Sequence, residues 1–551
     1  MSEYQLTPPT VSLYAERLML KVLFEYNGFS SFLGDRGWQR NDVARALGLP
    51  SKLEDDENFR SITKALLAER FEQVKSFKMG ANQGFDVAYQ NIENITKYLE
   101  LNETEKQILQ FSFHLRAEEA LKELFDCLPK LDLSRAVLFL AKLFDIDPKK
   151  IRNALHKNSK LFSYGLLERN YSPDQVHEFV QWDDNLDFND FTIQLVTENT
   201  LLQRCVLVAE SPKLALSQFE HIAEMREMML TYLQNVVKMQ KKGVNILLYG
   251  LPGTGKTEFA TLLGQTLELP TYTMAYMDKD GDVLDGETRL ENCRLAQKLL
   301  GDRLALIVFD EIEDIFGSGL FERSVAQKNK AWLNQFLETN PIPMIWISND
   351  VSMMDNAYLR RFDFVFEMPN LPAANKQQLM QELVGDKLSP DYIRHFSQIH
   401  ELSPAVITRA LSVVSTLQPN AEPQQFAEQA MKIFNQTLMA QGMKKIEPLA
   451  TNKVLYNLDY VSCNSNIHKI SEGLKRTKQG RICCYGPPGT GKTAWANWLG
   501  EELGMPVLVR QGSDLLGSYV GETERNIAAA FEQAKINNMV LVFNEVDTFW
   551  G

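Results

Sequence analysis

Two segments of the chain carry glycines, a lysine and a threonine in a spacing that is typical of phosphate-binding loops. They read G-L-P-G-T-G-K-T at residues 250–257 and G-P-P-G-T-G-K-T at residues 486–493. Between a strand and a helix, such a loop turns backbone N–H groups and a helix N-terminus toward phosphate oxygens. The residues of the first copy predicted to bind nucleotide are Gly250, Pro252, Gly253, Thr254, Gly255, Lys256 and Thr257.

Carboxylates follow the next strongly apolar run, at residues 304–309, as the pair Asp310 and Glu311. The run reads as a buried strand of a parallel sheet, which would place the pair at the carboxyl edge beside the phosphate loop. We expect Asp310, with the hydroxyl of Thr257, to hold Mg²⁺, and Glu311 to accept a proton from an attacking water. A further apolar run at 344–348 ends in Asn349, an amide that could orient this water.

Two adjacent arginines, Arg360 and Arg361, precede the apolar run at residues 364–366. Arginines at the start of a strand are usually solvated surface residues. From their position alone we would therefore assign them no role in catalysis.

The second copy keeps the same order of landmarks, since Lys256 matches Lys492 and Asp310 matches Asn544 at a nearly constant offset. An amide at position 544 lacks the charge that helps to hold Mg²⁺. The sequence stops at Gly551, before any counterpart of Asn349 or the arginines, so we expect a second module truncated after its acidic strand, with weak nucleotide binding and little turnover. Its predicted binding residues are Gly486, Gly489, Thr490, Gly491, Lys492, Thr493 (also the expected metal ligand) and Glu545.

The elements around these motifs suggest four parts: a helical region at 1–200, an α/β domain at 201–370, a helical lid at 371–445 and a second α/β domain at 446–551. Residues 41–50 resemble the first half of a helix-turn-helix, but the acidic run at 54–57 favours a helical hairpin or a protein-docking surface over DNA reading. Residues 481–485, which contain Cys483 and Cys484, read as a buried strand.

The composition narrows the function. Hydrophobic residues make up 44% and charged residues 23%, ordinary values for a globular protein. A net charge of −13 makes nucleic acid an unlikely partner, because phosphate-backbone affinity depends on clustered lysine and arginine. The six cysteines show no zinc-ligand spacing. Neither a signal peptide nor a long apolar run is evident, so we expect a cytoplasmic protein without a membrane partner.

Taken together and in this order, the phosphate loop, Asp310-Glu311, Asn349 and the run Leu359-Arg-Arg-Phe-Asp363 resemble the classical AAA family of the AAA+ superfamily, from about residue 200 onward. The resemblance implies an α/β P-loop NTPase fold with a helical lid, here duplicated after a mostly α-helical N-terminal region. It also implies ATP and Mg²⁺ as ligands, and a homo-oligomeric ring, usually a hexamer, with ATP at the subunit interfaces. Arg360 and Arg361 then become arginine fingers that reach the neighbour's γ-phosphate, with Arg361 preferred. Ala405 stands where other AAA+ proteins carry a sensor-2 arginine, with Arg409 a weaker substitute.

One further segment bears on the substrate. Residues 517–522, with Tyr519, resemble the aromatic pore loop by which AAA unfoldases grip polypeptide, whereas the first-module counterpart at 283–287 has no aromatic. The expected function is therefore ATP-driven remodelling or unfolding of protein substrates, with the N-terminal region recruiting substrate or an adaptor. Two alternatives stay open: a nucleic-acid-associated motor or loader, and an ATP-dependent assembly switch with little turnover, which Asn544 would favour.

Overall fold

The computed structural model describes residues 4–35, 37–75, 84–170, 172–301, 303–316, 324–328, 330–352, 354–418, 421–443, 445–449, 456–516, 522–536 and 538–545. The chain divides into two compact units, one of Met1–Tyr249 with Lys256–Glu367 and one of Gly250–Gly255 with Met368–Gly551. Within the described ranges, no helix is both long enough and apolar enough to cross a bilayer.

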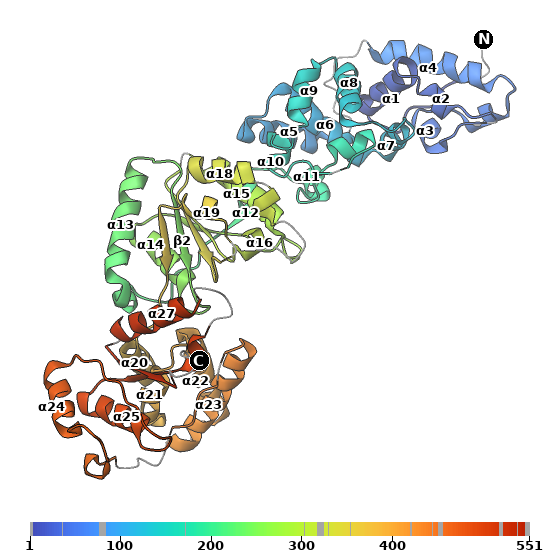
Figure 1. Cartoon of the computed structure of the whole chain (residues 1–551). Coiled ribbons are helices and arrows are strands. Elements are labelled where there is room, and N and C mark those ends of the chain that lie inside the picture. The colour runs from blue at the N-terminus through green and yellow to red at the C-terminus, as the bar shows by residue number, and fades with distance from the viewer. Residues whose placement is uncertain are drawn as a thin grey trace. The chain divides into compact units, whose positions relative to one another are not determined.

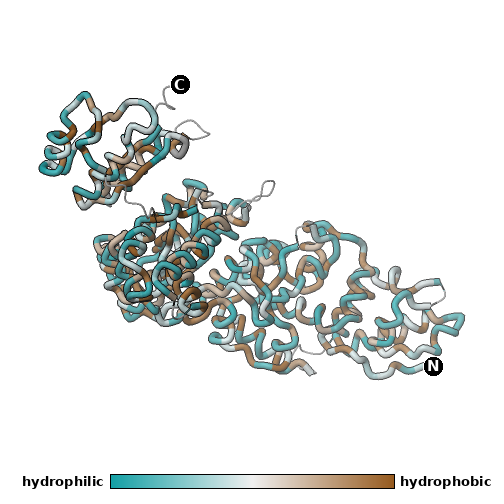
Figure 2. Tube along the Cα trace, turned by 90° about the horizontal axis from the view of Figure 1, so that it is seen from below, coloured by the Kyte–Doolittle hydropathy of each residue, from teal (hydrophilic) through white to brown (hydrophobic). Residues whose placement is uncertain are grey.

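The N-terminal region consists of short amphipathic helices. In α5 the residues Ala88, Ile92, Ile95 and Leu99 recur at helical spacing and are buried. Hydrophobic and hydrophilic residues accordingly alternate along the trace of this region (Figure 2). Its α-helices are α1 (Leu13–Glu25), α2 (Phe29–Phe32), α3 (Asn41–Ala46), α4 (Phe59–Lys75), α5 (Asp86–Leu99), α6 (Glu103–Ala117), α7 (Glu119–Asp126), α8 (Leu133–Phe144), α9 (Pro148–Ala154), α10 (Lys160–Ser163), α11 (Phe188–Ile193) and α12 (Glu198–Cys205).

A six-stranded sheet in the order β1-β3-β4-β5-β2-β6 forms the centre of the first α/β domain (Figure 1). All neighbouring strands pair in parallel except β1 and β3, which are antiparallel. Strands β4 and β5 are buried along their whole length, as expected for parallel strands covered on both faces. The strands are β1 (Val206–Val208), β2 (Asn245–Tyr249), β3 (Thr271–Met274), β4 (Leu306–Phe309), β5 (Met344–Ser348) and β6 (Phe364–Glu367).

Helices follow most of these strands and position the loops at the sheet's carboxyl edge. Helix α14 starts at Lys256, directly after the phosphate loop, and contacts β3, β4 and β5. Helix α15 contacts β1 and β3, and it also contacts α5, α10 and α12 of the N-terminal region. The helices of this domain are α13 (Ala223–Lys238), α14 (Lys256–Thr266), α15 (Gly286–Leu300), α16 (Glu313–Phe316), α17 (Val325–Lys328), α18 (Lys330–Thr339) and α19 (Asn356–Leu359).

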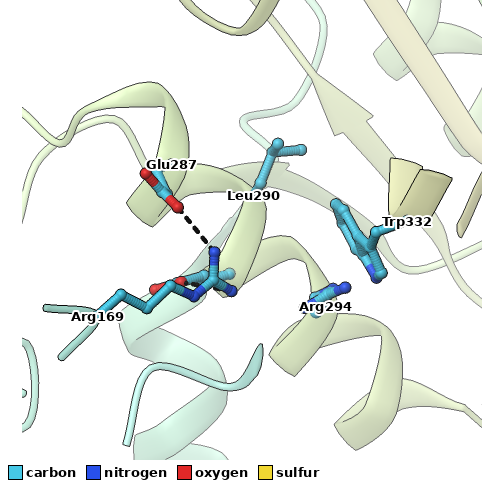
Figure 3. A pocket seen from close by; sticks show the side chains of 6 residues that line it. Arg169, Glu287, Leu290, Arg294 and Trp332 are labelled. Atoms are coloured by element: carbon cyan, nitrogen blue, oxygen red, sulfur yellow. Dashed lines mark hydrogen bonds and ion pairs between the residues drawn. The ribbon is translucent and has the colours of Figure 1, made fainter. Parts of the chain in front are cut away.

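Ion pairs tie the N-terminal region to α15. Arg169 pairs with Glu287 at 2.7 Å and with Glu291 at 3.0 Å, and Figure 3 shows the guanidinium reaching the start of this helix. Burial raises the pKa of Glu291 to about 8 although Arg169 acts against the shift. The start of α15 is therefore held from the N-terminal side by a largely buried charge cluster.

The segment after Met368 is helical. Helices α20 (Ala373–Val384), α21 (Pro390–Ser397), α22 (Pro404–Leu417) and α23 (Pro423–Ala440) enclose an apolar core of their own. Lys376 is buried in this segment, where its Nζ donates to the Ile399 carbonyl at 2.7 Å, and burial lowers its pKa to about 8.

The second α/β segment contains α24 (Ile467–Thr477), α25 (Lys492–Leu503), α26 (Gly512–Leu515), α27 (Glu522–Ile536) and the parallel strands β7 (Val507–Gln511) and β8 (Val540–Asn544). The expectation of a buried strand at 481–485 is wrong. These residues form no strand, Tyr485 is 85% exposed, and Cys483 and Cys484 are exposed. In the first domain the corresponding strand, β2, pairs with β5 and β6. No strand follows β8 in the described part of the chain, so residues 481–485 have neither partner within it.

Candidate functional site

The loop at residues 250–255 has the backbone that phosphate binding requires. Gly250, Gly253 and Gly255 all have positive φ, of 136°, 77° and 90°, which side-chain-bearing residues rarely adopt. A Cβ added at Gly253 would lie 2.7 Å from the Cβ of Ala405. The predicted loop thus depends on its glycines both for conformation and for space.

Lys256, at the start of α14, is 6% exposed and donates from Nζ to Asn349 Oδ1 at 3.1 Å. Burial lowers the pKa of this lysine, while Asp310 and Glu313 act in the opposite direction. The two side chains come from the ends of neighbouring parallel strands, since β2 leads into Lys256 and β5 into Asn349. The structure therefore brings together the predicted lysine and the predicted amide.

Thr257 donates from its hydroxyl to Asp310 Oδ2 at 2.5 Å. Hydroxyl and carboxylate oxygens are hard ligands of the kind that Mg²⁺ prefers, and here one of each lies beside the lysine expected to bind phosphate. These two residues fit the metal that the sequence pattern implies. They would hold it, and it would supply charge compensation for the phosphates.

Glu311 is exposed and has a left-handed backbone, with φ of 53°. Glutamate rarely occupies this region, and the strain of about 1 to 2 kcal/mol tends to persist where surrounding contacts enforce it. The conformation lets the chain turn immediately after Asp310. The adjacent carboxylates of Asp310 and Glu311 can therefore take the two roles expected of them, metal ligand and proton acceptor.

Glu313 belongs to this cluster and was not anticipated from the sequence. Its Oε1 accepts from the Ser348 hydroxyl at 3.1 Å and from the backbone N–H of Asn349. It thereby connects α16 to the end of β5 and fixes the residue that carries the predicted amide. A carboxylate shortly after the Asp-Glu pair was the available signal, but its partner lies far away in sequence.

Arg360 and Arg361 lie at the opposite edge of the sheet. The register pairs Phe364 with Ile246, so the arginines sit near the start of β2, whereas the phosphate loop follows its end. The four steps between the first and last residues of β2 cover about 13 Å at ~3.3 Å each. Arg361 donates to Glu338 at 2.8 Å and to the Ala357 carbonyl, while Arg360 is exposed. The structure does not bring either arginine to the other predicted residues.

The same backbone features recur in the second copy. Positive φ appears at Gly486, Gly489 and Gly491, and Glu545 has φ of 55° as Glu311 does. The threonine hydroxyl meets the side chain after the acidic strand in both copies, at a longer distance in the second. Lys492 donates to the carbonyls of Gly486 and Pro487 at 2.8 Å, and the Thr493 hydroxyl lies 3.4 Å from Asn544 Oδ1. Tyr519 and its predicted pore loop lie outside the described residues.

Comparison with known proteins found one family model and several relatives. The model of the family "ATPase family associated with various cellular activities (AAA)" matches residues 246–370 and 482–551. A cell division cycle protein 48 homolog of Archaeoglobus fulgidus is 24% identical over 419 residues, 65% of this chain and 56% of the relative. Protein CdcH of Halobacterium salinarum is 23% identical over 373 residues, 59% and 50% of the two chains.

A shorter match is closer in sequence. The peroxisomal ATPase pex6 of Schizosaccharomyces pombe is 40% identical over 79 residues, which is 14% of this chain and 8% of the relative. The chain spans only about half the length of the first two of these relatives. The two matched segments, which have the α/β P-loop architecture described above, are thus similar to the AAA family of ATPases.

Proposed function

We propose that the chain hydrolyses ATP at the first site and uses the energy to remodel or unfold protein substrates. The observation that carries this proposal is the convergence of Lys256, Thr257, Asp310 and Asn349 at the carboxyl edge of the sheet. Lys256 provides a point charge for the β- and γ-phosphates, and Asn349 orients the attacking water. Glu311 accepts a proton from this water. In the same step the water oxygen forms a bond to the γ-phosphorus, and the bond between the γ-phosphorus and the β-phosphate oxygen breaks.

The position of the arginines supports hydrolysis between subunits. Because Arg360 and Arg361 lie about 13 Å of strand away from the phosphate loop of their own chain, a role at the γ-phosphate requires a neighbouring copy. We therefore propose a homo-oligomeric ring, usually a hexamer in this family. Residues 371–445 would form the lid of the first site, and residues 446–551 would form a second, related module. Residues 1–200 would recruit substrate or an adaptor. We propose that the protein acts in the cytoplasm.

The remodelling activity can be tested by trapping. The Glu311→Gln chain, held with ATP, should retain proteins identifiable by mass spectrometry after nuclease treatment, because bound ATP without turnover prolongs the substrate complex. The Lys256→Ala, Glu311→Gln chain is the matched control and should retain severalfold less. Equal retention by both chains would contradict the proposal. ATPase that is stimulated by DNA or RNA, with affinity that falls steeply with salt, would favour a nucleic-acid motor instead.

The second site is proposed to bind nucleotide weakly and to contribute almost no turnover. Asn544 carries no charge, so the second site lacks the carboxylate that is expected to help hold Mg²⁺ at the first. In steady-state assays Lys492→Ala should change the rate less than about twofold, whereas Glu311→Gln should lower it about a hundredfold. Substantial ATPase in the Lys256→Ala, Glu311→Gln chain that disappears on adding Lys492→Ala would instead show an active second site. Negligible turnover at both sites would favour an assembly switch.

A further inference from the structure

Arg289 is a buried arginine that contacts the backbone of the acidic pair. It lies on α15 and is 5% exposed. Its Nη2 donates to the Asp310 carbonyl at 2.6 Å, and its Nη1 donates to the Glu311 carbonyl at 3.0 Å. Nη1 also pairs with Asp314 at 2.8 Å, and the guanidinium lies 4.8 Å from the centre of the Phe309 ring. One rigid group thus touches four residues of the segment 309–314, which carries the predicted base.

The two carbonyl contacts restrict the conformation of Glu311 in particular. The Asp310 carbonyl belongs to the peptide plane before Glu311, and the Glu311 carbonyl belongs to the plane after it. Two parallel donors on a planar guanidinium therefore fix both planes, and with them the φ and ψ of the residue between. That φ has the left-handed value of 53°, and the two contacts help to hold it in place. The direction of the Glu311 side chain follows from this backbone.

Helix α15 is itself held in place on both sides. A Cβ added at Gly286 would lie 2.8 Å from the Asp314 carbonyl oxygen, so the helix start packs closely against the acidic segment. Glu287 and Glu291 pair with Arg169 of the N-terminal region (Figure 3). Each lies two residues from Arg289 along the helix and therefore points to the other side of it. Helix α15 is therefore held in place, and it holds the Arg289 guanidinium against the acidic segment.

We infer that Arg289 is a positioning residue for hydrolysis at the first site: it holds the backbone of Glu311 so that the carboxylate meets the attacking water. The inference rests on the proposed function of Glu311 as the base. The second copy has Glu524 at the corresponding place, three residues after Gly521, and an acidic side chain cannot donate to these carbonyls. An arginine at this position is therefore specific to the first module, whereas the left-handed backbone is common to Glu311 and Glu545.

The test compares Arg289→Met with Arg294→Met in the full chain. Arg294 is a matched control, because it is a buried arginine of the same helix whose guanidinium lies 3.3 Å from the centre of the Trp332 ring rather than against the carbonyls of the acidic pair. Arg289→Met should lower kcat about thirtyfold with the KM for ATP within about threefold of the parent, since an interaction that matters only in the transition state is lost. Arg294→Met should keep kcat, with a similar change in Tm.

The conservative variant supplies the second measurement. Arg289→Lys retains a charge that can reach one carbonyl, so its kcat should lie between those of the parent and Arg289→Met. If Arg289→Met fails to fold, a lowered kcat with unchanged KM in Arg289→Lys supports the assignment, and a parental kcat overturns it. Equal kcat in folded Arg289→Met and Arg294→Met also overturns it. If the parent chain hydrolyses ATP no faster than Glu311→Gln, the proposed function itself is overturned, and with it the positioning role of Arg289.

Discussion

Glu311→Gln should bind ATP as the parent does but hydrolyse it about a hundredfold more slowly, or slower still. The amide has the shape of the carboxylate but cannot accept the proton of the attacking water. Lys256 and the loop glycines, which are expected to bind the phosphates, are unaltered by the change. Nucleotide-binding and steady-state ATPase assays on the same preparation separate the two effects.

Two further variants control this experiment. Glu268 is an exposed glutamate that also has a left-handed backbone, with φ of 55°, so Glu268→Gln makes the same chemical change in the same conformation away from the site. It should leave both binding and rate unchanged. Lys256→Ala should show the reverse of Glu311→Gln, because the phosphates lose their point charge and binding falls. A parental rate in Glu311→Gln would mean that another group is the base.

Replacement of both Arg360 and Arg361 by alanine should leave ATP binding nearly unchanged and lower kcat about a thousandfold, the usual effect of removing an arginine finger. Single variants divide this effect between the two. The sequence pattern favours Arg361, but in the structure Arg361 is engaged by Glu338 whereas Arg360 is exposed. Arg394→Ala, which removes another exposed arginine, is the matched control and should have the parental rate.

Mixing the double arginine variant with Glu311→Gln tests whether the finger acts between subunits. At equal amounts, about a quarter of the interfaces would combine an intact base with a neighbour's intact arginines, so about a quarter of the parental rate should return. Assembly of the mixture should be verified by its mass in solution. A mixed assembly that stays inactive at every ratio would contradict a role in trans.

Most strands of the first domain could be predicted because apolar runs bounded by polar residues are local signals. The run at 344–348 coincides with β5, and that at 304–309 contains β4. The same signal failed at 481–485, where the residues resemble those of β2 in sequence but have no neighbouring strand in the described part of the chain. Composition describes what a segment could bury, whereas a strand also needs partners for its backbone hydrogen bonds.

The candidate site could be predicted only where spacing along the chain defines it. The phosphate loop and the Asp310-Glu311 pair follow strands directly, so their position was evident. Arg289 and Glu313 were missed because each acts on backbone atoms of a segment 20 or more residues away. No periodicity or motif records such a contact, and the side chains alone resemble ordinary charges on helices.

The separation of the arginines from the phosphate loop also limits how copies of this chain can associate. If one edge of the sheet donates the finger and the other receives it, the two surfaces are different, and contact between copies is heterologous rather than isologous. A two-fold symmetric dimer would therefore not place the arginine edge of one copy against the phosphate-loop edge of the other. Each added copy uses one surface and offers the other, so growth stops only when the rotation between copies closes a circle. Any rotation that fails to close would produce an open helical filament with one incomplete site at its end.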